Sequence, residues 1–167
     1  RYYLATSTAP GTDLRYDEEK VKSTWNFINK IWNASRFVLM NIEDLEKEDS
    51  SKLTDADKWI LTRYNKTVKD VTKYMDKYEF QNVGSILYKF IWEDFCDQYI
   101  EMAKFSLENV STKSTLKKVL VGILKMLHPF MPFVTEKIYS QIKGTTDALI
   151  ISPYPKVEKK EIFIDEE

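Results

Sequence analysis

The stretch DEEKVKSTWNFINKIWNASRFVLM, residues 17–40, predicts one long amphipathic helix. Asp17 can cap its start, and Glu18 and Glu19 in the first turn suit the positive end of the helix dipole. Mostly apolar side chains then recur every three or four residues, which places them on one stripe of the helix. The stripe consists of Val21, Trp25, Ile28, Trp32, Ser35 and Leu39. We expect this stripe to be buried as core against a partner helix.

Outward from this helix, the same periodicity predicts three more long helices and a short one. The expected spans are 54–78, 80–107, 111–127 and 134–142, the second of these being rich in aromatic residues. Thr54 caps the first of these spans, and Ser111 or Thr112 caps the third. That third span must end near His128-Pro129, because proline cannot continue a helix. An extended tail follows from residue 148, and its charged end after Val157 is expected to be frayed.

The predicted fold class is all-α, an antiparallel up-and-down bundle of about four long helices. Only 4 Gly and 5 Pro occur among 167 residues, with 43% hydrophobic and 14% aromatic side chains, which favours long helices over a turn-rich sheet. We expect one domain at 16–143. Residues 1–15 would be the end of a preceding helix and a loop, and residues 144–167 a tail leading toward a further C-terminal arm.

Bulk charge and cysteine content limit the possible partners. The charged residues, 31% of the chain, nearly cancel to a net charge of -1, so any nucleic-acid binding must be local. Cys96 is the single cysteine, and the sequence has no secretory leader and no apolar run near 18 residues. We therefore expect a cytoplasmic monomer without membrane contact. The chain starts at Arg1 without an initiator Met, which suggests a piece of a longer protein.

Sequence motifs for catalysis or cofactor binding are missing. The four glycines, at 11, 84, 122 and 144, form neither a dinucleotide-binding nor a Walker-type loop. His128, the only histidine, stands at a helix end where a ring nitrogen can hydrogen-bond a free carbonyl. Cys96 lies in an aromatic helix and reads as a small core residue. We predict no catalytic residue, no cofactor and no metal in this chain.

Four carboxylates lie close together in the expected helix at 80–107, namely Glu93, Asp94, Asp97 and Glu101. They would suit acid-base chemistry or a hard metal ion. Ion pairs to adjacent helices and a solvated edge are the favoured interpretation, because no histidine accompanies the carboxylates as a di-iron bundle would require.

A second stripe on the first long helix could bind RNA; it consists of Asn26, Asn29, Lys30, Asn33, Arg36 and Phe37. Asparagine is a poor helix former, so three in two turns suggest that their amides are used. Amides and lysine can read base edges, arginine can hold phosphate, and an exposed phenylalanine can stack on a base. Alternatively, the asparagines form a network between helices and Phe37 is core. Spacing alone leaves both interpretations open.

A basic stripe on the next helix is a weaker candidate. Its members, Lys66, Lys69, Lys73 and Lys77, recur every three or four residues and suit phosphate contacts. A solvated face explains them equally well, because Asp70 and Asp76 dilute the charge.

Four blocks of the sequence resemble one family. NKIWNASRFVLMN, residues 29–41, resembles the signature helix of valyl-tRNA synthetases, which are class I aminoacyl-tRNA synthetases. Three further blocks agree in order and spacing: TAPGTDLRYD at 8–17, WEDFCDQYIE at 92–101 and LHPFMPFVTE at 127–136. The last block is also found in similar form in leucine and isoleucine enzymes. The resemblance covers almost the whole chain and implies the helical anticodon-binding domain.

The resemblance also implies site residues and partners. Lys30 and Phe37 match the family's anticodon-facing helix, Ile100 matches a position near the same bases, and Asn33 and Arg36 flank them. Asn26 belongs to the same stripe. Relatives often have a basic residue near the start of this helix, where the chain has Glu18 and Glu19; Lys20 is expected to substitute.

The implied partners are a valine tRNA and a catalytic domain of the parent enzyme in cis, which would use ATP and magnesium. That domain's HIGH and KMSKS signatures do not occur here, and neither do the heptads of a C-terminal coiled-coil arm, so the chain alone is expected to bind tRNA weakly. Two alternatives remain open: the equivalent domain of an isoleucine enzyme, and a helical protein-interaction module that never touches RNA.

Overall fold

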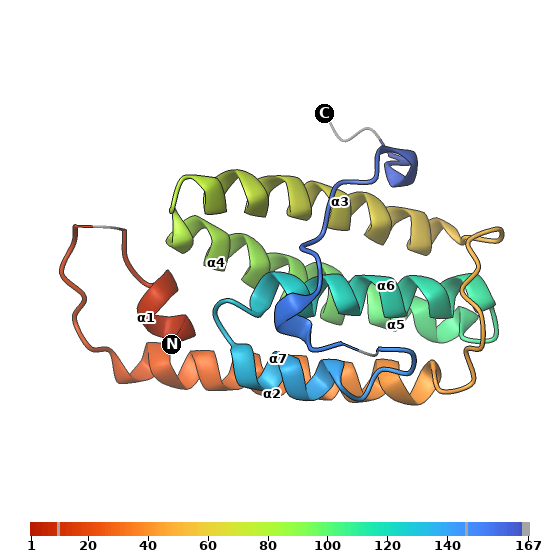
Figure 1. Ribbon diagram of the computed structural model, residues 1–167, viewed down its shortest axis with the longest axis horizontal. Helices are drawn as coiled ribbons and strands as arrows, with labels where there is room; N and C mark the ends of the chain where they lie inside the picture. Colours follow the sequence, from red (N-terminus) through yellow and green to blue (C-terminus); the bar gives the residue numbers. More distant parts are fainter. Residues whose placement is uncertain (10, 146, 165–167) are drawn as a thin grey trace.

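The computed structural model describes residues 1–9, 11–145 and 147–164, and within these ranges helix is the only regular secondary structure. The expected all-α bundle is confirmed. Its elements lie in three layers, with α2 (Glu18–Asn41) on one side and α3 (Asp55–Asp76) on the opposite side (Figure 1). Between them lie α6 (Val110–Leu127) and a long helical run at 80–106. The middle layer therefore has two faces, each covered by a different helix.

The run at 80–106, which we call the third helix, changes its hydrogen-bonding pattern along its length. It consists of α4 (Phe80–Lys89), the π-helix η1 (Phe90–Tyr99), α5 (Ile100–Ala103) and the 3₁₀ turn η2 (Lys104–Ser106). A π-helix closes i→i+5 hydrogen bonds and therefore brings residues five apart to one side. Trp92 and Asp97 form one such pair, and Asp94 and Tyr99 form another.

Capping side chains explain where the long helices begin. The Asp17 carboxylate accepts hydrogen bonds from the backbone N–H groups of Glu19 and Lys20, as predicted. Thr54 and Asp57 form a reciprocal capping box at the start of α3. The cap of α6 differs from the prediction, because Asn109, not Ser111 or Thr112, accepts from the helix.

Two short helices flank the bundle. The first is α1 (Tyr2–Thr6), and the second, α7 (Pro132–Tyr139), begins with proline at its first position. The expected short helix thus lies two residues earlier than predicted. Pro10, in the loop block at 8–17, lies outside the described residues.

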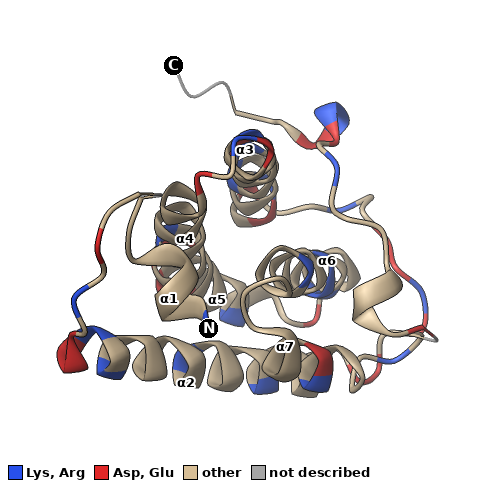
Figure 2. Ribbon diagram, turned by 60° about the vertical axis from the view of Figure 1, so that its left-hand side comes forward, with Lys and Arg blue, Asp and Glu red and all other residues tan. Residues whose placement is uncertain are grey.

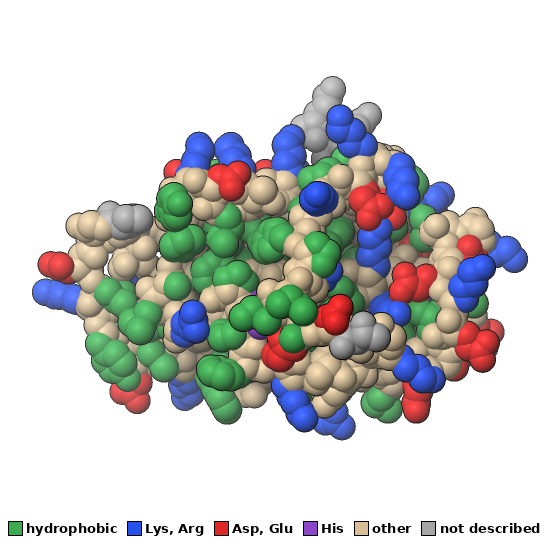
Figure 3. Space-filling model, viewed as in Figure 1, with side chains coloured by type: hydrophobic (Ala, Val, Ile, Leu, Met, Phe, Trp, Pro, Cys, Tyr) green, Lys and Arg blue, Asp and Glu red, His purple; other side chains and the backbone are tan. Residues whose placement is uncertain are grey.

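The predicted core stripe of α2 is correct only in part, because Ile28, Trp32 and Leu39 pack against the core without being fully buried. Apart from Ser35, which was in the predicted stripe, the buried residues of α2 are Phe27, Ile31 and Val38. Trp25 is 62% exposed, and with Val21 and Ile28 it lines an apolar groove that α1 and the segment 130–134 complete. Both sets of residues recur every three or four positions, so periodicity could not show which of them is most deeply buried. Hydrophobic side chains gather on the half of the surface near α1 and α4 (Figure 3).

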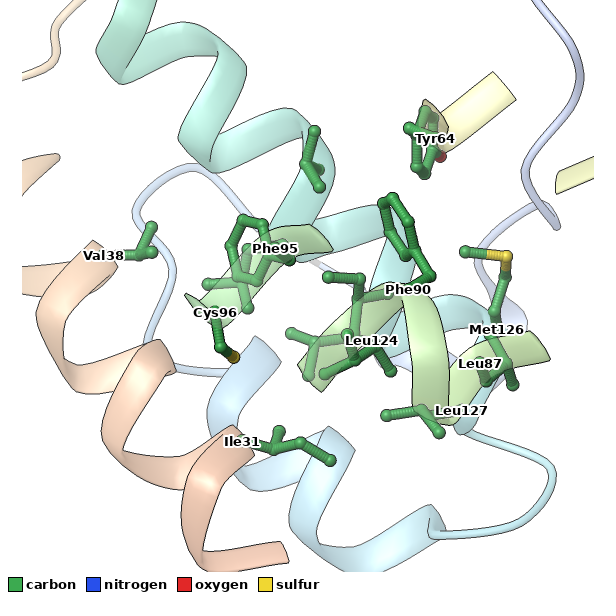
Figure 4. Close-up of a cluster of buried hydrophobic side chains, with 14 of the residues drawn as sticks. Ile31, Val38, Tyr64, Leu87, Phe90, Phe95, Cys96, Leu124, Met126 and Leu127 are labelled. Carbon is green, nitrogen blue, oxygen red and sulfur yellow. The ribbon is translucent and has the colours of Figure 1, made fainter. Parts of the chain in front are cut away.

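The core proper lies where α2, the third helix, α3 and α6 meet. Figure 4 shows Ile31 and Val38 of α2 facing Cys96 of the third helix and Leu124 and Leu127 of α6. A methyl group at Gly122 of α6 would overlap the Tyr64 ring of α3, so only glycine allows this close approach. The long helices thus share a single core.

The C-terminal segment lies along α3 and differs from the frayed end expected after Val157. The Glu158 N–H donates to the Asn65 side chain at 2.7 Å, and the Phe163 N–H donates to the Thr62 hydroxyl at 3.0 Å. Two 3₁₀ turns, η3 (Leu149–Ile151) and η4 (Lys159–Glu161), shape the segment. Residues 146 and 165–167, also part of the predicted tail, lie outside the described residues. In the described ranges, no helix is both long and apolar enough to cross a membrane.

Candidate nucleic-acid interface

The polar stripe of α2 is accessible to a ligand. Asn26, Asn29 and Asn33 are exposed, as is Arg36, whereas Lys30 and Phe37 are half-buried. Exposed asparagines do not form the buried network that was the alternative interpretation. On the side of Lys30 and Phe37, α2 packs against the third helix, and we call this junction the α2 seam, made of Lys30, Phe37, Trp92, Asp97, Glu101 and Lys104.

Lys30 is held from two directions. Its ammonium lies over the Trp92 ring, 4.3 Å from the ring centroid, and forms an ion pair with Asp97. Trp92 in turn stacks on Tyr88, with centroids 5.5 Å apart and an interplanar angle of 19°. A cation over an indole face is attracted by the ring quadrupole, so both contacts restrict the same ammonium.

Phe37 repeats this arrangement two helical turns further along α2. The Lys104 ammonium lies 5.9 Å from the centroid of the Phe37 ring and pairs with Glu101 at 2.7 Å. The α2 seam thus contains two lysines, each near an aromatic ring and each next to a carboxylate. The sequence identified Lys30 and Phe37 as candidate site residues. It did not identify Trp92, Asp97 or Lys104 as their partners.

Two other predicted site residues differ from Lys30 and Phe37, one in burial and one in position. Ile100 is only 6% exposed, so little of its side chain is open to a base. Lys20 is exposed but stands ten residues before Lys30, which is about 15 Å along a helix axis. The structure therefore brings Lys30 and Phe37 together on one side of α2, with Asn26 and Asn33 beside them, and leaves Lys20 at the far end of the helix.

The four carboxylates of the third helix divide between two faces. Asp94 points toward α3 and accepts from the Arg63 guanidinium at 2.9 Å, whereas Asp97 pairs with Lys30 of α2 and Glu101 with Lys104. Glu93 is exposed. Ion pairs to adjacent helices are confirmed for Asp94 and Asp97, whereas Glu101 pairs within the third helix. No metal-type cluster of His, Cys, Asp and Glu is found in the described part of the chain.

The opposite face of the third helix carries a buried polar network, which we call the α3 seam: Asp57, Arg63, Asp94, Tyr99 and Thr112. The fully buried Asp57 carboxylate accepts from the Tyr99 hydroxyl at 2.6 Å and the Thr112 hydroxyl at 2.9 Å. It also accepts from the Thr54 N–H at 2.9 Å. Burial and the neighbouring Asp57 charge raise the pKa of Tyr99 far above its ordinary range, so this phenol stays a hydrogen-bond donor.

The basic stripe of α3 does not join the α2 stripe. Lys66, Lys69, Lys73 and Lys77 are all exposed. They belong to the helix on the opposite side of the bundle from α2 (Figures 1 and 2). One RNA segment lying on the α2 seam would therefore not touch them, and the two predicted RNA-binding stripes do not form one surface.

His128 and Cys96 have structural environments. The Thr135 hydroxyl donates to the Met131 carbonyl at 2.7 Å, so it accepts from His128 Nδ1, 2.9 Å away. Burial raises the pKa of the Cys96 thiol to about 12, which keeps it protonated at neutral pH. Both residues behave as parts of the fold, as the sequence suggested.

Comparisons with known proteins agree with the sequence resemblance. A family model described as the anticodon-binding domain of tRNA ligase matches residues 57–167. The chain is 52% identical to a protein named valine-tRNA ligase from Bacillus cereus, over 95% of the chain and 19% of the relative. It is 53% identical to one of the same name from Staphylococcus aureus, over 98% of the chain and 20% of the relative. The chain thus spans about a fifth of the length of these relatives.

A solved structure shares the fold. The chain superposes with a TM-score of 0.75 on part of LeuRS from Agrobacterium radiobacter, which was crystallised as a ternary complex described as LeuRS-tRNA-LeuAMS. The match covers 97% of this chain and 20% of that one, at 13% sequence identity. At this identity the likeness concerns the arrangement of helices and not the side chains.

Proposed function

The chain belongs to the anticodon-binding domain family of tRNA ligases, and from this premise we propose that it recognises the anticodon of a valine tRNA. We propose further that it does so as one domain of a full-length valine-tRNA ligase. Its bounds would be about 16–143, with 144–167 leading toward a C-terminal arm. The catalytic domain, joined in cis, would bind ATP and magnesium and charge the tRNA.

The α2 seam, together with the exposed polar side chains of α2 beside it, is the observation that supports this proposal. Anticodon bases are recognised by hydrogen bonds to their edges and by stacking on aromatic rings. Asn26 and Asn33 offer exposed amides, Lys30 offers ammonium hydrogens, and Phe37, one turn beyond Asn33, offers a half-buried ring. Arg36, also exposed, suits a backbone phosphate.

The side chains of this chain indicate what it would contribute to the ligase. The chain supplies binding groups, and its contribution would be specificity: holding the correct tRNA so that its 3′ end reaches a distant active site. With a net charge of -1, the chain provides no broad basic field, so affinity for RNA in general should be low. Recognition would act within a monomeric ligase in the cytoplasm.

Two observations weigh against the alternatives. The isoleucine interpretation is disfavoured because the relatives at 52–53% identity are named valine-tRNA ligase. The protein-interaction interpretation needs the asparagines of α2 to be buried between helices, and they are exposed. It also predicts binding that ignores the anticodon.

A salt-controlled titration tests the proposal directly. A valine tRNA and the same tRNA with a swapped anticodon are titrated against the chain and its Lys30→Ala, Phe37→Ala double variant. We expect the wild type to prefer the valine anticodon and the variant to lose that preference. Since one base stack contributes about 1–3 kcal/mol, the loss should be roughly 5- to 150-fold.

A matched control uses the far side of the bundle. The Lys69→Ala, Lys73→Ala variant removes two positive charges from α3, on the face opposite the α2 seam. It should keep the anticodon preference of the wild type, and a cooperative thermal unfolding transition in each variant establishes that both are folded. Equal loss of preference in both variants would show that charge alone, and not the α2 seam, governs binding.

A further inference from the structure

Lys30 has an unusual environment for a residue expected to touch RNA. A lysine that binds phosphate normally has a mobile side chain and acts as a point charge on a flexible stem, without a carboxylate paired to its ammonium. Lys30 is 28% exposed, its ammonium lies over Trp92, and a carboxylate already pairs with it. Both partners come from one side of the π-helix η1, five residues apart.

The pairing has a consequence for which RNA group can approach. A phosphate oxygen that comes to Lys30 also meets the Asp97 carboxylate, which is 49% exposed beside it. Like charges repel, so the pair attracts phosphate less than an isolated lysine does. An ammonium has three N–H donors, and Asp97 engages one. The remaining donors can reach an uncharged base acceptor without such repulsion.

Trp92 restricts the position of the Lys30 ammonium from a second side. It stacks on Tyr88 and lies 6.5 Å from the Phe27 ring, which is completely buried, so its position is fixed by packing. The ammonium therefore rests on a rigid ring and points at one place. Pre-ordered donors lose less conformational freedom on binding and discriminate more sharply between ligands.

We propose that Asp97 and Trp92 are positioning residues that make Lys30 a reader of anticodon base edges and not a phosphate contact. This inference rests on the proposed function and adds to it: the ligand group of Lys30 is a base carbonyl or ring nitrogen. Arg36, exposed on the same helix, remains the residue suited to phosphate. Asp97 thus lowers affinity for RNA in general and raises the preference for one anticodon.

Asp97→Asn in the full-length ligase tests the inference. The amide keeps the size and a hydrogen-bond acceptor but removes the charge that repels phosphate. We expect the preference for the valine anticodon, measured as a ratio of kcat/KM values for matched and swapped tRNAs, to fall roughly tenfold. Binding of the swapped tRNA should become tighter, and the slope of log K against log salt should steepen by about one.

Two further variants separate this role from a purely structural one. Asp97→Glu restores the charge and should recover most of the preference. The Lys30→Ala, Asp97→Asn double variant removes both charges of the pair and leaves the local net charge unchanged, so it should lose the preference and keep the wild-type salt slope. A slope that falls by about one in this double variant would mean that Lys30 binds phosphate and would overturn the inference.

The remaining outcomes are also decisive. Asp44→Asn breaks a comparable exposed ion pair, with Lys113, outside the α2 seam and should change neither the ratio nor the slope. An Asp97→Asn ligase with wild-type ratio and slope would overturn the inference while the proposed function stands. A wild-type ligase without anticodon preference would overturn the proposed function itself. Equal melting temperatures of wild type and Asp97→Asn establish that the comparison concerns binding.

Discussion

The two faces of the third helix carry the same kinds of side chain in different environments, one buried and one exposed. In the α3 seam, Asp57 and Asp94 are buried, and each is satisfied by hydrogen-bond donors from neighbouring helices. In the α2 seam, Asp97 pairs with a lysine at the surface, where water and ligands compete for both partners. A buried carboxylate that loses its donors has no replacement, whereas an exposed pair can exchange one partner for RNA.

This difference teaches where stability and recognition reside. The buried network ties α3, the third helix and α6 together and fixes the position of η1. Because η1 is rigid on its α3 side, Trp92 and Asp97 are presented to α2 in a defined geometry. The α3 seam therefore supports the α2 seam without touching a ligand.

The largest effect is expected for Asp57→Ala. The change leaves the Tyr99 and Thr112 hydroxyls and the Thr54 N–H without their buried acceptor. The free energy of unfolding should fall by about 3 kcal/mol, measured by urea denaturation. Asp55→Ala, in the same first turn of α3 but fully exposed, is the control and should change little. A similar small change in both variants would contradict the contrast between the seams.

A direct comparison follows from Asp94→Asn and Asp97→Asn, which are the same substitution three residues apart. Asp94 is 7% exposed and bonded to Arg63, so its neutralisation should cost about 2 kcal/mol of unfolding free energy. Asp97 is half-exposed, and its neutralisation should cost less than about 0.5 kcal/mol. Thermal unfolding of the two variants side by side measures the difference. Equal losses would mean that exposure does not separate the two seams.

The ion pairs between Lys118 and the C-terminal segment are intermediate in exposure between the α3 seam and the α2 seam, so they extend the comparison of the two seams. Hydrogen bonding to Lys118 lowers the pKa of Glu158. Burial lowers the pKa of Lys118, but hydrogen bonds to Glu158 and Glu161 outweigh it and the net pKa is raised. A carboxylate with a lowered folded-state pKa stabilises fully above its ordinary pKa of about 4.3 and loses this contribution as the pH falls through the lowered value.

We therefore expect acid to loosen the attachment of residues 158–163 to α3 before the bundle unfolds. The protection factors of the Glu158 and Phe163 amides against hydrogen exchange, relative to the unstructured rate at the same pH, should fall below about pH 4.3, by an amount equivalent to less than about 1 kcal/mol because the pair is partly solvated. Their acceptors, Asn65 and Thr62, do not titrate. In Lys118→Met the pH dependence should disappear; a dependence that persists would assign it to another group.

The helices and the fold class could be predicted from the sequence because helical periodicity and capping act locally. The most deeply buried residues of α2 could not, since the sets through Trp25 and through Phe27 both recur every three or four residues and only the neighbouring helices decide how deeply each is buried. The cap at Asn109 was missed for a related reason: Ser111 and Thr112 bond instead to Lys52 and Asp57, which are distant in sequence.

The candidate site was predictable only in part. The resemblance to valyl-tRNA synthetases singled out Lys30 and Phe37, and their roles remain predictions. Trp92 and Asp97 were not recognised as the partners of Lys30, because α-helical spacing places Asp97 beside Asp94, on the same side of the third helix. The π-helix separates the two carboxylates, and nothing in the local pattern of residues 90–99 signals that change of hydrogen bonding.

The smallest effect is expected for Ser35→Ala, on the inward side of α2. Its hydroxyl is buried, and no hydrogen bond to it is found among the described residues. Removing it should therefore leave the free energy of unfolding unchanged or raise it by less than about 0.5 kcal/mol. Ser114→Ala is the matched control, since that hydroxyl donates to the Val110 carbonyl and accepts from the Asp49 N–H. The control should lose about 1 kcal/mol in the same urea titration, because the Asp49 amide would lose its acceptor. A larger loss in Ser35→Ala than in Ser114→Ala would show that burial alone, and not the presence of partners, sets the cost of removing a hydroxyl.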